Sequence, residues 1–123
     1  MLWTIAEFTG KYKRPIFVLG KNERYRADEF LKGCRNENKD CFNTLTRLIQ
    51  RLADCHEMRN STQFKQVRKN LFELKVQNYR LYLFFDDERI ILVDGGKKGA
   101  EKSQTRDIDN AQRAKDEYFR EKS

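Results

Sequence analysis

Three short apolar runs follow one another in the second half of the chain with almost nothing between them, and this spacing constrains the fold more than any other feature. The runs are LFELKVQ, YRLYLFF and RIILVDG, which begin at residues 71, 79 and 89. They are rich in the β-branched and aromatic residues that favour strands, and gaps this short leave no room for a crossover helix. The spacing therefore predicts an antiparallel meander.

A two-residue turn at residues 77–78 gives the first hairpin of this meander a consistent pattern. One face of the hairpin is then apolar, and the other carries two cations. The cross-strand pairs in this register are Lys75 with Arg80, Leu74 with Leu81, and Phe72 with Leu83.

The register of the second hairpin stays open. A two-residue loop and a three-residue loop are both compatible with the sequence DDER at residues 86–89. Shifting the register by one residue moves every side chain of a strand to the other face. The two loops therefore place Asp94 on opposite faces of the sheet.

The first half of the chain predicts strand followed by two helices. Residues 2–8 and 15–20 are short and rich in strand-forming residues, so one or both should be strand. Residues 26–34 have helical spacing, with Gly33 as a stop signal. A longer amphipathic helix is predicted from Asp40, because apolar residues recur there every three or four positions. These residues are Cys41, Leu45, Leu48, Ile49 and Leu52.

Two polar segments complete the predicted fold. Residues 57–70 show no sustained period and are predicted to form a surface loop, whereas residues 105–122 predict a closing helix with acidic residues in its first turn. A chain of 123 residues suits one small core. We therefore expect residues 1–123 to form a single α+β domain with one or two N-terminal strands, two helices, a three-stranded meander and a C-terminal helix.

The charge balance favours an anionic partner. The chain has 26 Lys and Arg against 19 Asp and Glu, a net charge of +7. A basic surplus of this size on a small domain suits nucleic acid, an anionic membrane or an acidic protein. No apolar stretch approaches the length of a membrane span, and the N-terminus lacks the pattern of a signal peptide. We therefore expect a cytoplasmic protein that does not enter the membrane.

The cysteines and the single histidine predict no metal or disulfide chemistry. Cys34, Cys41 and Cys55 include no C-x-x-C pair, so they are interpreted as reduced thiols. His56 falls on the apolar side of the long helix, where a packing or capping role is the simpler interpretation. No cofactor or metal site is predicted.

Basic residues gather around the meander, and they suggest chemistry on phosphates. The third run ends in Asp94 and a glycine pair, and a lysine-rich loop is predicted to follow. Lysines crowded by other cations have lowered pKa values and can accept protons, while arginine holds phosphate oxygens bidentately. Breaking RNA without a metal requires deprotonation of the 2′-hydroxyl, stabilisation of the oxyanion and protonation of the leaving oxygen. The candidates are Lys75, Arg80, Lys97, Lys98 and Lys102, with Arg68 and Lys69 before the meander.

Simpler interpretations of the same residues stand beside this hypothesis. Runs of charge usually form solvated faces, and the pair Gly95-Gly96 most simply forms a turn. Glu73 shares a face with Lys75 and would either neutralise or orient it. Base stacking requires an accessible aromatic ring. The sequence offers Tyr79, Tyr82, Phe84 or Tyr118 without choosing among them, and Tyr82 and Tyr118 are retained as the RNA-binding candidates.

Residues 71–118 resemble the second half of the RelE/ParE toxin superfamily, particularly its phage-derived HigB-like branch. That branch shows a glwELR strand, a yRvfyf strand, a strand ending in llHGF, a KKtqktP loop and a helix beginning near EI..A. Here LFELK, YRLYLFF, ILVDGGKK and DIDNA match these pieces in order. The matching positions include Lys75, Arg80, Lys98 and Lys102, with Lys97 on a variable position.

The resemblance implies a small basic toxin of a type II toxin-antitoxin system, held by an acidic antitoxin in a hetero-oligomer. In the RelE and HigB branches such toxins are ribosome-dependent mRNA endonucleases. It implies that Lys75, Lys98 and Lys102 supply proton transfer and phosphate charge, and that Arg80 clamps the scissile phosphate. The ParE branch, which poisons DNA gyrase without cutting RNA, shares the fold.

The chain departs from the HigB-like pattern at four positions of the third strand and the loop. Asp94 replaces histidine, a candidate general acid or base, and Gly96 replaces phenylalanine. Gly99 and Gln104 replace a lysine and the proline. Three hypotheses follow: an mRNA-cleaving toxin, a binding module that is either a gyrase inhibitor or an inactive toxin relic, and a basic nucleic-acid-binding domain without a reaction.

Overall fold

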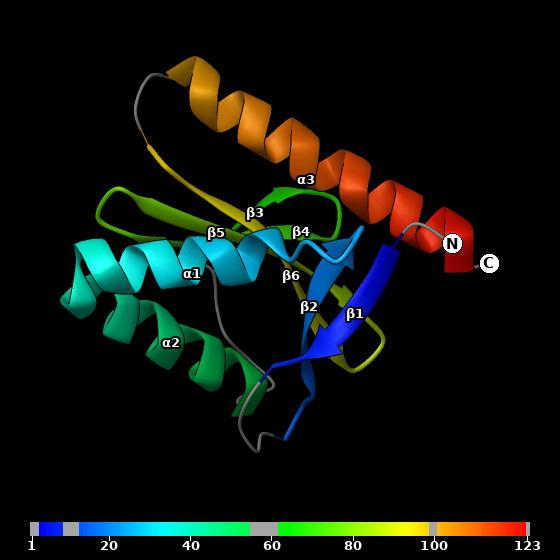
Figure 1. The fold of residues 1–123 in the computed structure, drawn as a ribbon, viewed down its shortest axis with the longest axis horizontal. Coiled ribbons are helices and arrows are strands. Elements are labelled where there is room, and N and C mark those ends of the chain that lie inside the picture. The colour runs from blue at the N-terminus through cyan, green and yellow to red at the C-terminus, as the bar shows by residue number, and fades with distance from the viewer. Residues whose placement is uncertain (1–2, 9–12, 55–61, 99–100, 123) are drawn as a thin grey trace.

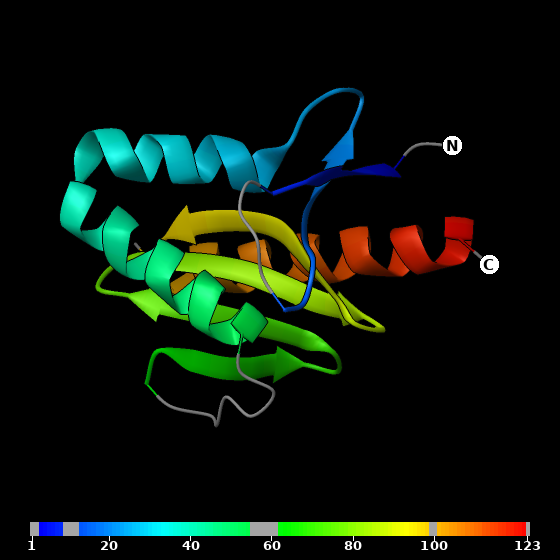
Figure 2. The same cartoon turned by 90° about the horizontal axis from the view of Figure 1, so that it is seen from below.

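The computed structural model describes residues 3–8, 13–54, 62–98 and 101–122, with only the backbone at 101–103. One six-stranded sheet, in the order β1-β2-β6-β5-β4-β3, is covered by α1 and α2 on one face and by α3 on the other (Figures 1 and 2). The strands are β1 (Trp3–Glu7), β2 (Ile16–Lys21), β3 (Phe64–Arg68), β4 (Leu71–Val76), β5 (Tyr79–Asp86) and β6 (Arg89–Lys97). The helices are α1 (Arg26–Glu37), α2 (Lys39–Asp54) and α3 (Glu101–Lys122). The predicted α+β class is confirmed.

The predicted meander and the register of its first hairpin are confirmed. β4 and β5 pair antiparallel through a turn at residues 77–78, and the structure has all three predicted cross-strand pairs. Gln77 takes a left-handed φ of 52°, which a two-residue hairpin turn requires. Both Lys75 and Arg80 therefore lie on the face that α3 covers.

The second hairpin combines a two-residue turn with a bulge, and the bulge decides the face of Asp94. Asp86 pairs with Arg89 across the turn, but the register shifts between Tyr82 and Leu83. Asp94 consequently pairs with Tyr82 and not with Leu81. A β-bulge adds one residue to one strand and reverses the facing of the residues beyond it. Asp94 therefore faces α3.

Both N-terminal segments are strands, and they extend the sheet beyond the meander. β1 and β2 form an antiparallel hairpin, while β2 runs parallel to β6, with Ile16 opposite Ile90. The two helices and the first strands of the meander provide the long connection that a parallel pair requires. β6 therefore lies inside the sheet, where the chain brings its N-terminal hairpin beside its last strand.

Two predictions about element boundaries were wrong in the first 70 residues. The predicted surface loop contains β3, an edge strand whose only fully buried side chain is Phe64, so its sequence is as polar as a loop. Gly33 does not end α1, which continues to Glu37. Asn38 provides the real boundary: its N–H bonds the Cys34 carbonyl, and its side chain accepts the Cys41 N–H at 3.1 Å.

Two further predictions were wrong after β6. The glycine pair does not form a turn, because Gly95 and Gly96 both lie within β6. The closing helix begins at Glu101, four positions before the predicted start, so Lys102 belongs to a helix and not to a loop. Gln104 stands where the family pattern has proline, and a residue with an N–H permits helix at this position.

Two apolar layers hold the sheet between its helices. The first layer packs α1 and α2 on one face and includes Leu45, Leu74 and Leu83. The second packs α3 on the other face and includes Phe84, Ile91 and Tyr118. The predicted core positions of the long helix, from Cys41 to Leu52, are all buried as expected, and Ala53 joins them. The candidate site lies in the α3 layer.

Candidate functional site

The end of the sheet formed by the β4–β5 turn and the last residues of β6 gathers several of the predicted cations. Lys75 pairs with Arg80, and Arg80 pairs with Gly96 on the next strand. The Lys98 N–H donates to the carbonyl of Asn78 at 2.6 Å. Lys75 and Lys98 are both exposed. The backbone thus brings two accessible lysines to one end of the sheet with an arginine between them.

Arg80 is buried in a network beneath α3. Its Nε lies 3.3 Å from Glu73 Oε1, and both residues are less than 5% exposed. Its Nη1 donates to the carbonyls of Gln77 at 2.6 Å and Tyr79 at 3.2 Å. Gln104 of α3 donates to Glu73 Oε1 at 3.0 Å. Glu73 therefore pairs with Arg80, and Arg80 also fixes the β4–β5 turn.

Lys97 points to the opposite face of the sheet from Arg80. It pairs with Glu37 of α1 at 2.8 Å and lies 5.4 Å from the centre of the Tyr79 ring. The hydrogen bond from Lys97 to Glu37 raises the Lys97 pKa. Lys97 therefore does not share a face with the two cations of the first hairpin.

Arg68 and Lys69 lie at the far end of β4 from Lys75. Arg68 pairs with Asp109 of α3 at 3.2 Å, and the carbonyl of Lys69 accepts a bond from Lys115 at 2.5 Å. Six residues of extended strand span about 20 Å. The sequence had suggested that these two cations converge with Lys75 on one phosphate. In the structure they do not.

The two tyrosines predicted to stack bases are buried. Tyr82 has no exposed surface, and burial raises its pKa. Its hydroxyl has no hydrogen-bond partner within the part of the chain that the structure describes. Tyr118 donates to Asp86 Oδ2 at 2.7 Å, and burial together with this bond raises its pKa to about 12. A stacking role for either ring is inconsistent with its burial in this structure.

The glycine pair brings both layers close to the end of β6. A Cβ on Gly95 would come within 2.3 Å of the Phe30 ring in α1. A Cβ on Gly96 would come within 2.4 Å of Asp107 Oδ2 in α3. The glycines therefore serve close packing on the two faces of one strand.

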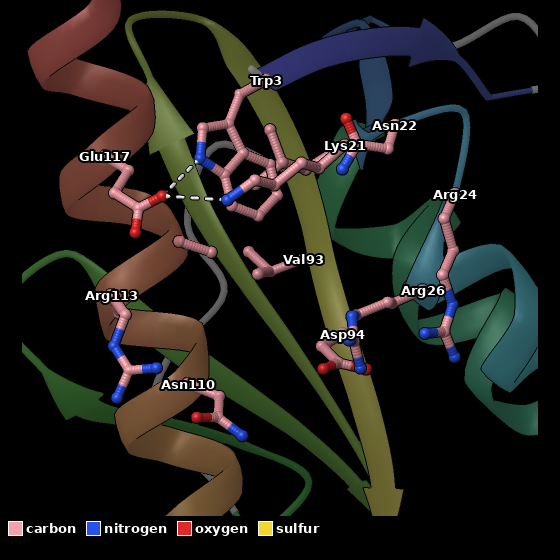
Figure 3. Close-up of a pocket in the computed structure, with 12 residues that line it drawn as sticks. Trp3, Lys21, Asn22, Arg24, Arg26, Val93, Asp94, Asn110, Arg113 and Glu117 are labelled. Carbon is pink, nitrogen blue, oxygen red and sulfur yellow. Dashed lines mark hydrogen bonds and ion pairs between the residues drawn. The ribbon is translucent and has the colours of Figure 1, made fainter.

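Asp94 lines a pocket of about 450 Å³ that the sequence did not reveal (Figure 3). Its Oδ1 accepts the Gly95 N–H at 2.8 Å. Burial raises the Asp94 pKa, against the opposing effect of that bond and of Arg26. The pocket lies between β6, the N-terminal hairpin and α3. Its lining residues are Trp3, Leu19, Lys21, Asn22, Arg24, Arg26, Val93, Asp94, Asn110, Arg113, Ala114 and Glu117.

Some expectations concern residues that the structure does not describe. Cys55 and His56 lie outside the described residues, as does the side chain of Lys102. Within the described ranges, no group of three or more His, Cys, Asp or Glu residues is placed to hold a metal ion. Among the described helices, none is long and apolar enough to cross a membrane.

The family of the chain is identified by its match to a protein-family model. The model for Phage derived protein Gp49-like (DUF891) matches residues 31–116, well over half of the chain. The chain belongs to the Gp49-like family. This family belongs broadly to the RelE/HigB-type toxins, which agrees with the α+β fold. No curated protein matches the chain, and no solved structure does.

Three of the four departures of this Gp49-like chain from the HigB-like pattern have structural counterparts, whereas Gly99 lies outside the described residues. Asp94 lies in the pocket beside Arg26, and Gly96 lets Asp107 approach β6. Gln104 bonds Glu73 and connects the first turns of α3 to the buried ion pair. Gly96 and Gln104 therefore contribute to the packing of α3 against the sheet.

Apart from Asp94, the pocket residues were not predicted from the sequence, because they come from distant segments. Trp3, Arg24 and Arg26 precede the part of the chain that the Gp49-like model matches, whereas Asn110 and Arg113 lie within it on α3. The parallel pairing of β2 with β6 brings the first set beside the last strand. The only sequence signal was the presence of Arg24 and Arg26 at the start of a predicted helix, which is too common a feature to indicate a site.

Proposed function

We propose that this Gp49-like chain is the toxin of a type II toxin-antitoxin system and that it cleaves messenger RNA by side-chain chemistry on the ribosome. The observation that carries the proposal is the gathering of cations at one end of the sheet. Strand pairing brings Lys75, Arg80 and the start of the lysine-rich segment at Lys98 together there. Membership of a family broadly related to RelE/HigB-type toxins supports it.

In this proposal the exposed lysines contact the RNA. Lys75 and Lys98 are accessible, and Lys102 follows in the first turn of α3. A positioned lysine can neutralise the charge that develops on the phosphate and can transfer a proton to or from the reacting oxygens. Cleavage then proceeds by attack of the 2′-oxygen on the adjacent phosphorus, with departure of the 5′-oxygen.

Arg80 contributes in a more constrained way than a free phosphate clamp. Its Nε has no hydrogen-bond partner among the described residues, although it lies 3.3 Å from Glu73. The guanidinium is covered by α3, which is tied to the ion pair through Gln104. Direct contact between Arg80 and a phosphate therefore requires the first turns of α3 to move. Without this movement, Arg80 supports the site by fixing the turn that presents Lys75.

The proposed partners follow from the charge and the family. The net charge of +7 suits both RNA and an acidic antitoxin that would occupy the same cations. A toxin that acts on translating ribosomes works in the cytoplasm.

A second candidate function is a binding module without catalysis, acting either on gyrase or as a relic held by an antitoxin. The burial of Arg80 against Glu73 and the aspartate at the family histidine position favour it. A buried arginine whose charge is offset by a carboxylate supplies little charge to an external phosphate. This candidate predicts binding and toxicity, or binding alone, without RNA cuts.

The test is inducible expression in bacteria with mapping of transcript 5′ ends. The informative variant is Lys75→Gln with Lys98→Gln, because both side chains are exposed and their loss leaves no buried charge. The matched control is Arg47→Gln with Arg51→Gln, which removes the same charge from α2. We expect growth arrest and new cuts inside translated messages from the parent chain and the control, with loss of both in the lysine variant.

One result contradicts the endonuclease, and another contradicts the assignment of its residues. Growth arrest without RNA cuts but with DNA damage indicates the gyrase inhibitor. RNA cuts that persist in the lysine variant show that cleavage does not depend on Lys75 and Lys98. In either case, far-ultraviolet circular dichroism should show the same folded state for all variants.

A further inference from the structure

The pocket between the N-terminal hairpin and α3 has basic residues on opposite walls. Arg24 precedes α1, Arg26 is the first residue of α1, and Arg113 comes from α3. Figure 3 shows these walls on either side of β6, whose Val93 and Asp94 form the floor. Its described lining includes none of the proposed lysines of the RNA-cleaving site.

In one half of the pocket, the polar and charged side chains already bind one another. Trp3 Nε1 donates to Glu117 at 2.9 Å, and Lys21 lies 3.5 Å from the same carboxylate. The Lys21 ammonium also lies 5.0 Å from the centre of the Trp3 ring. The hydrogen bond from Trp3 and the nearby lysine lower the Glu117 pKa, so this carboxylate is charged at neutral pH. The charges of Lys21 and Glu117 therefore offset each other (Figure 3).

The other half of the pocket has cations in excess. Arg24 is held by Glu29 through two bonds of 3.1 Å. Arg26 and Arg113 make no ion pair within the described residues, and the carboxylate that shares their half of the pocket is Asp94. The Asp94 side chain already accepts the Gly95 N–H. This half of the pocket therefore contains the guanidinium groups of Arg26 and Arg113 with one carboxylate, Asp94, on which the charge of Arg26 acts.

Burial disfavours the charged form of the carboxyl groups near this half of the pocket. Removal of Asp94 from water raises its pKa, and the nearby Asp107 carboxyl is shifted the same way by its own burial. The amide of Asn110 adds a neutral donor on the α3 wall. Arginine is the side chain best suited to hold the oxygens of a phosphoryl group bidentately.

We propose that this pocket is a phosphate-binding site in which Arg26 and Arg113 hold one phosphoryl group from opposite walls, with Asn110 as an additional donor. The ligand class is a nucleotide phosphate, supplied either by a flanking segment of an RNA strand or by a free mononucleotide. A volume of about 450 Å³ lies within the range of small-molecule sites. The site is independent of whether the chain cleaves RNA, because it uses different residues.

The pocket has a built-in reporter, because Trp3 is the only tryptophan of the chain. Tryptophan emission therefore reports the environment of one residue that lines the pocket. The probes are inorganic phosphate, adenosine monophosphate and a 2′-O-methyl oligoribonucleotide that resists cleavage. Isothermal titration calorimetry provides the second readout for the probes that absorb light. We expect a saturable change in emission with each probe.

The variants assign that change to the two arginines. Arg26→Gln and Arg113→Gln should each weaken binding by about tenfold or more, as expected when a charged hydrogen bond to phosphate is lost. Arg47→Gln with Arg51→Gln is the control for net charge and should bind as the parent chain does. Asp94→Asn should tighten binding several-fold, because it removes the negative charge beside the phosphate.

The outcomes distinguish the source of the phosphate and test the site. Tighter binding of the oligoribonucleotide than of the mononucleotide identifies an RNA strand, and equal or weaker binding identifies a free nucleotide. Absence of saturable binding with all three probes overturns the proposal. Binding that survives in both arginine variants, or weakens in Asp94→Asn, overturns it as well.

Discussion

Both faces of the sheet are covered by helices, but the two faces differ in what they bury. Among the described residues, the fully buried side chains of the layer beneath α1 and α2 are hydrophobic. Among the described residues, the buried charged side chains all lie on the α3 side of the sheet or on α3 itself. They are Glu73, Arg80, Asp86 and Lys115.

The difference indicates which face specifies function and which provides stability. Burying a charge costs free energy that even a good partner only offsets, and an apolar pair of similar volume is often as stable or more stable. An apolar layer therefore suffices to hold the fold, as it does beneath α1 and α2. Two of these charged residues, Glu73 and Arg80, lie at the end of the sheet that carries the proposed RNA-cleaving lysines. We therefore infer that this pair is retained for the β4–β5 turn that it fixes and presents.

The largest effect is expected from breaking the buried pair with Glu73→Ala. The substitution leaves the Arg80 guanidinium buried without its carboxylate, and such a change costs about 3–5 kcal/mol of the free energy of unfolding. Urea denaturation of the parent chain and the variant measures it. The contrasting control is Glu73→Leu combined with Arg80→Met, which should recover most of the loss because no charge remains buried. A single variant as stable as the parent chain would show that the pair is not buried in solution.

A second large effect is expected at the other end of α3, where Asp86 receives three cationic or hydroxyl partners. Lys122 lies 2.6 Å from its Oδ2, Tyr118 donates at 2.7 Å, and Arg89 lies 2.8 Å away. Asp86→Asn removes the charge from this cluster, and we expect a loss of about 2 kcal/mol near neutral pH, in the range for hydrogen bonds to charged groups.

The pH dependence of that loss tests its electrostatic origin. Burial alone would raise the Asp86 pKa, but the bonds from Lys122 and Tyr118 and the charge of Arg89 outweigh it, so the pKa falls below its ordinary 3.8. A group with a lowered folded pKa stabilises the fold above its unfolded pKa and loses this contribution as the pH falls through the folded value. The gap between parent chain and Asp86→Asn should therefore be full at neutral pH and close in strong acid. A gap that is constant with pH would assign the loss to packing.

Periodicity and turn chemistry predicted the part of the site that depends on backbone pairing. Lys75 opposite Arg80 followed from alternation and a two-residue turn, and the structure has this pair. The burial of Arg80 was not predictable in the same way, because it depends on α3, which lies more than 20 positions further along the chain. Glu73 and Arg80 are diagonal neighbours on one face, and only the covering helix decides that they pair with each other.

The facing of Asp94 and the position of the pocket could not be predicted, because they depend on the bulge in β6 and on the parallel pairing of β2. One extra residue between Leu92 and Asp94 turns Asp94 toward α3, and no residue type in that strand marks the position. The pocket depends on β2 lying beside β6, a contact between segments more than 70 positions apart. Local sequence patterns do not encode such contacts.

A smaller difference in stability is expected between substitutions at two neighbouring glycines of β6, one on each face of the sheet. Gly95→Ala places a methyl group against the Phe30 ring, which packs on the apolar layer, and overpacking of this kind costs about 1–3 kcal/mol. Gly96→Ala meets the end of the Asp107 side chain, which can move, and should cost less than about 1 kcal/mol. Thermal unfolding of the two variants measures the difference. Equal losses would mean that the α3 face is packed as rigidly as the α1 face.

The smallest effects are expected at the two exposed ion pairs, where the contrast between the faces should vanish. Lys97 pairs with Glu37 on the α1 side, and Arg68 pairs with Asp109 on the α3 side, with each side chain between 42% and 57% exposed. Exposed pairs contribute about 0–1 kcal/mol and are screened by salt. Lys97→Gln and Arg68→Gln should therefore each cost less than about 1 kcal/mol, and both losses should shrink as salt is added in urea denaturation. A large loss of unfolding free energy in Arg68→Gln alone would show that exposed charges on the α3 side also stabilise the fold. Equal small losses in both variants would show that only the buried charges of the α3 layer do so.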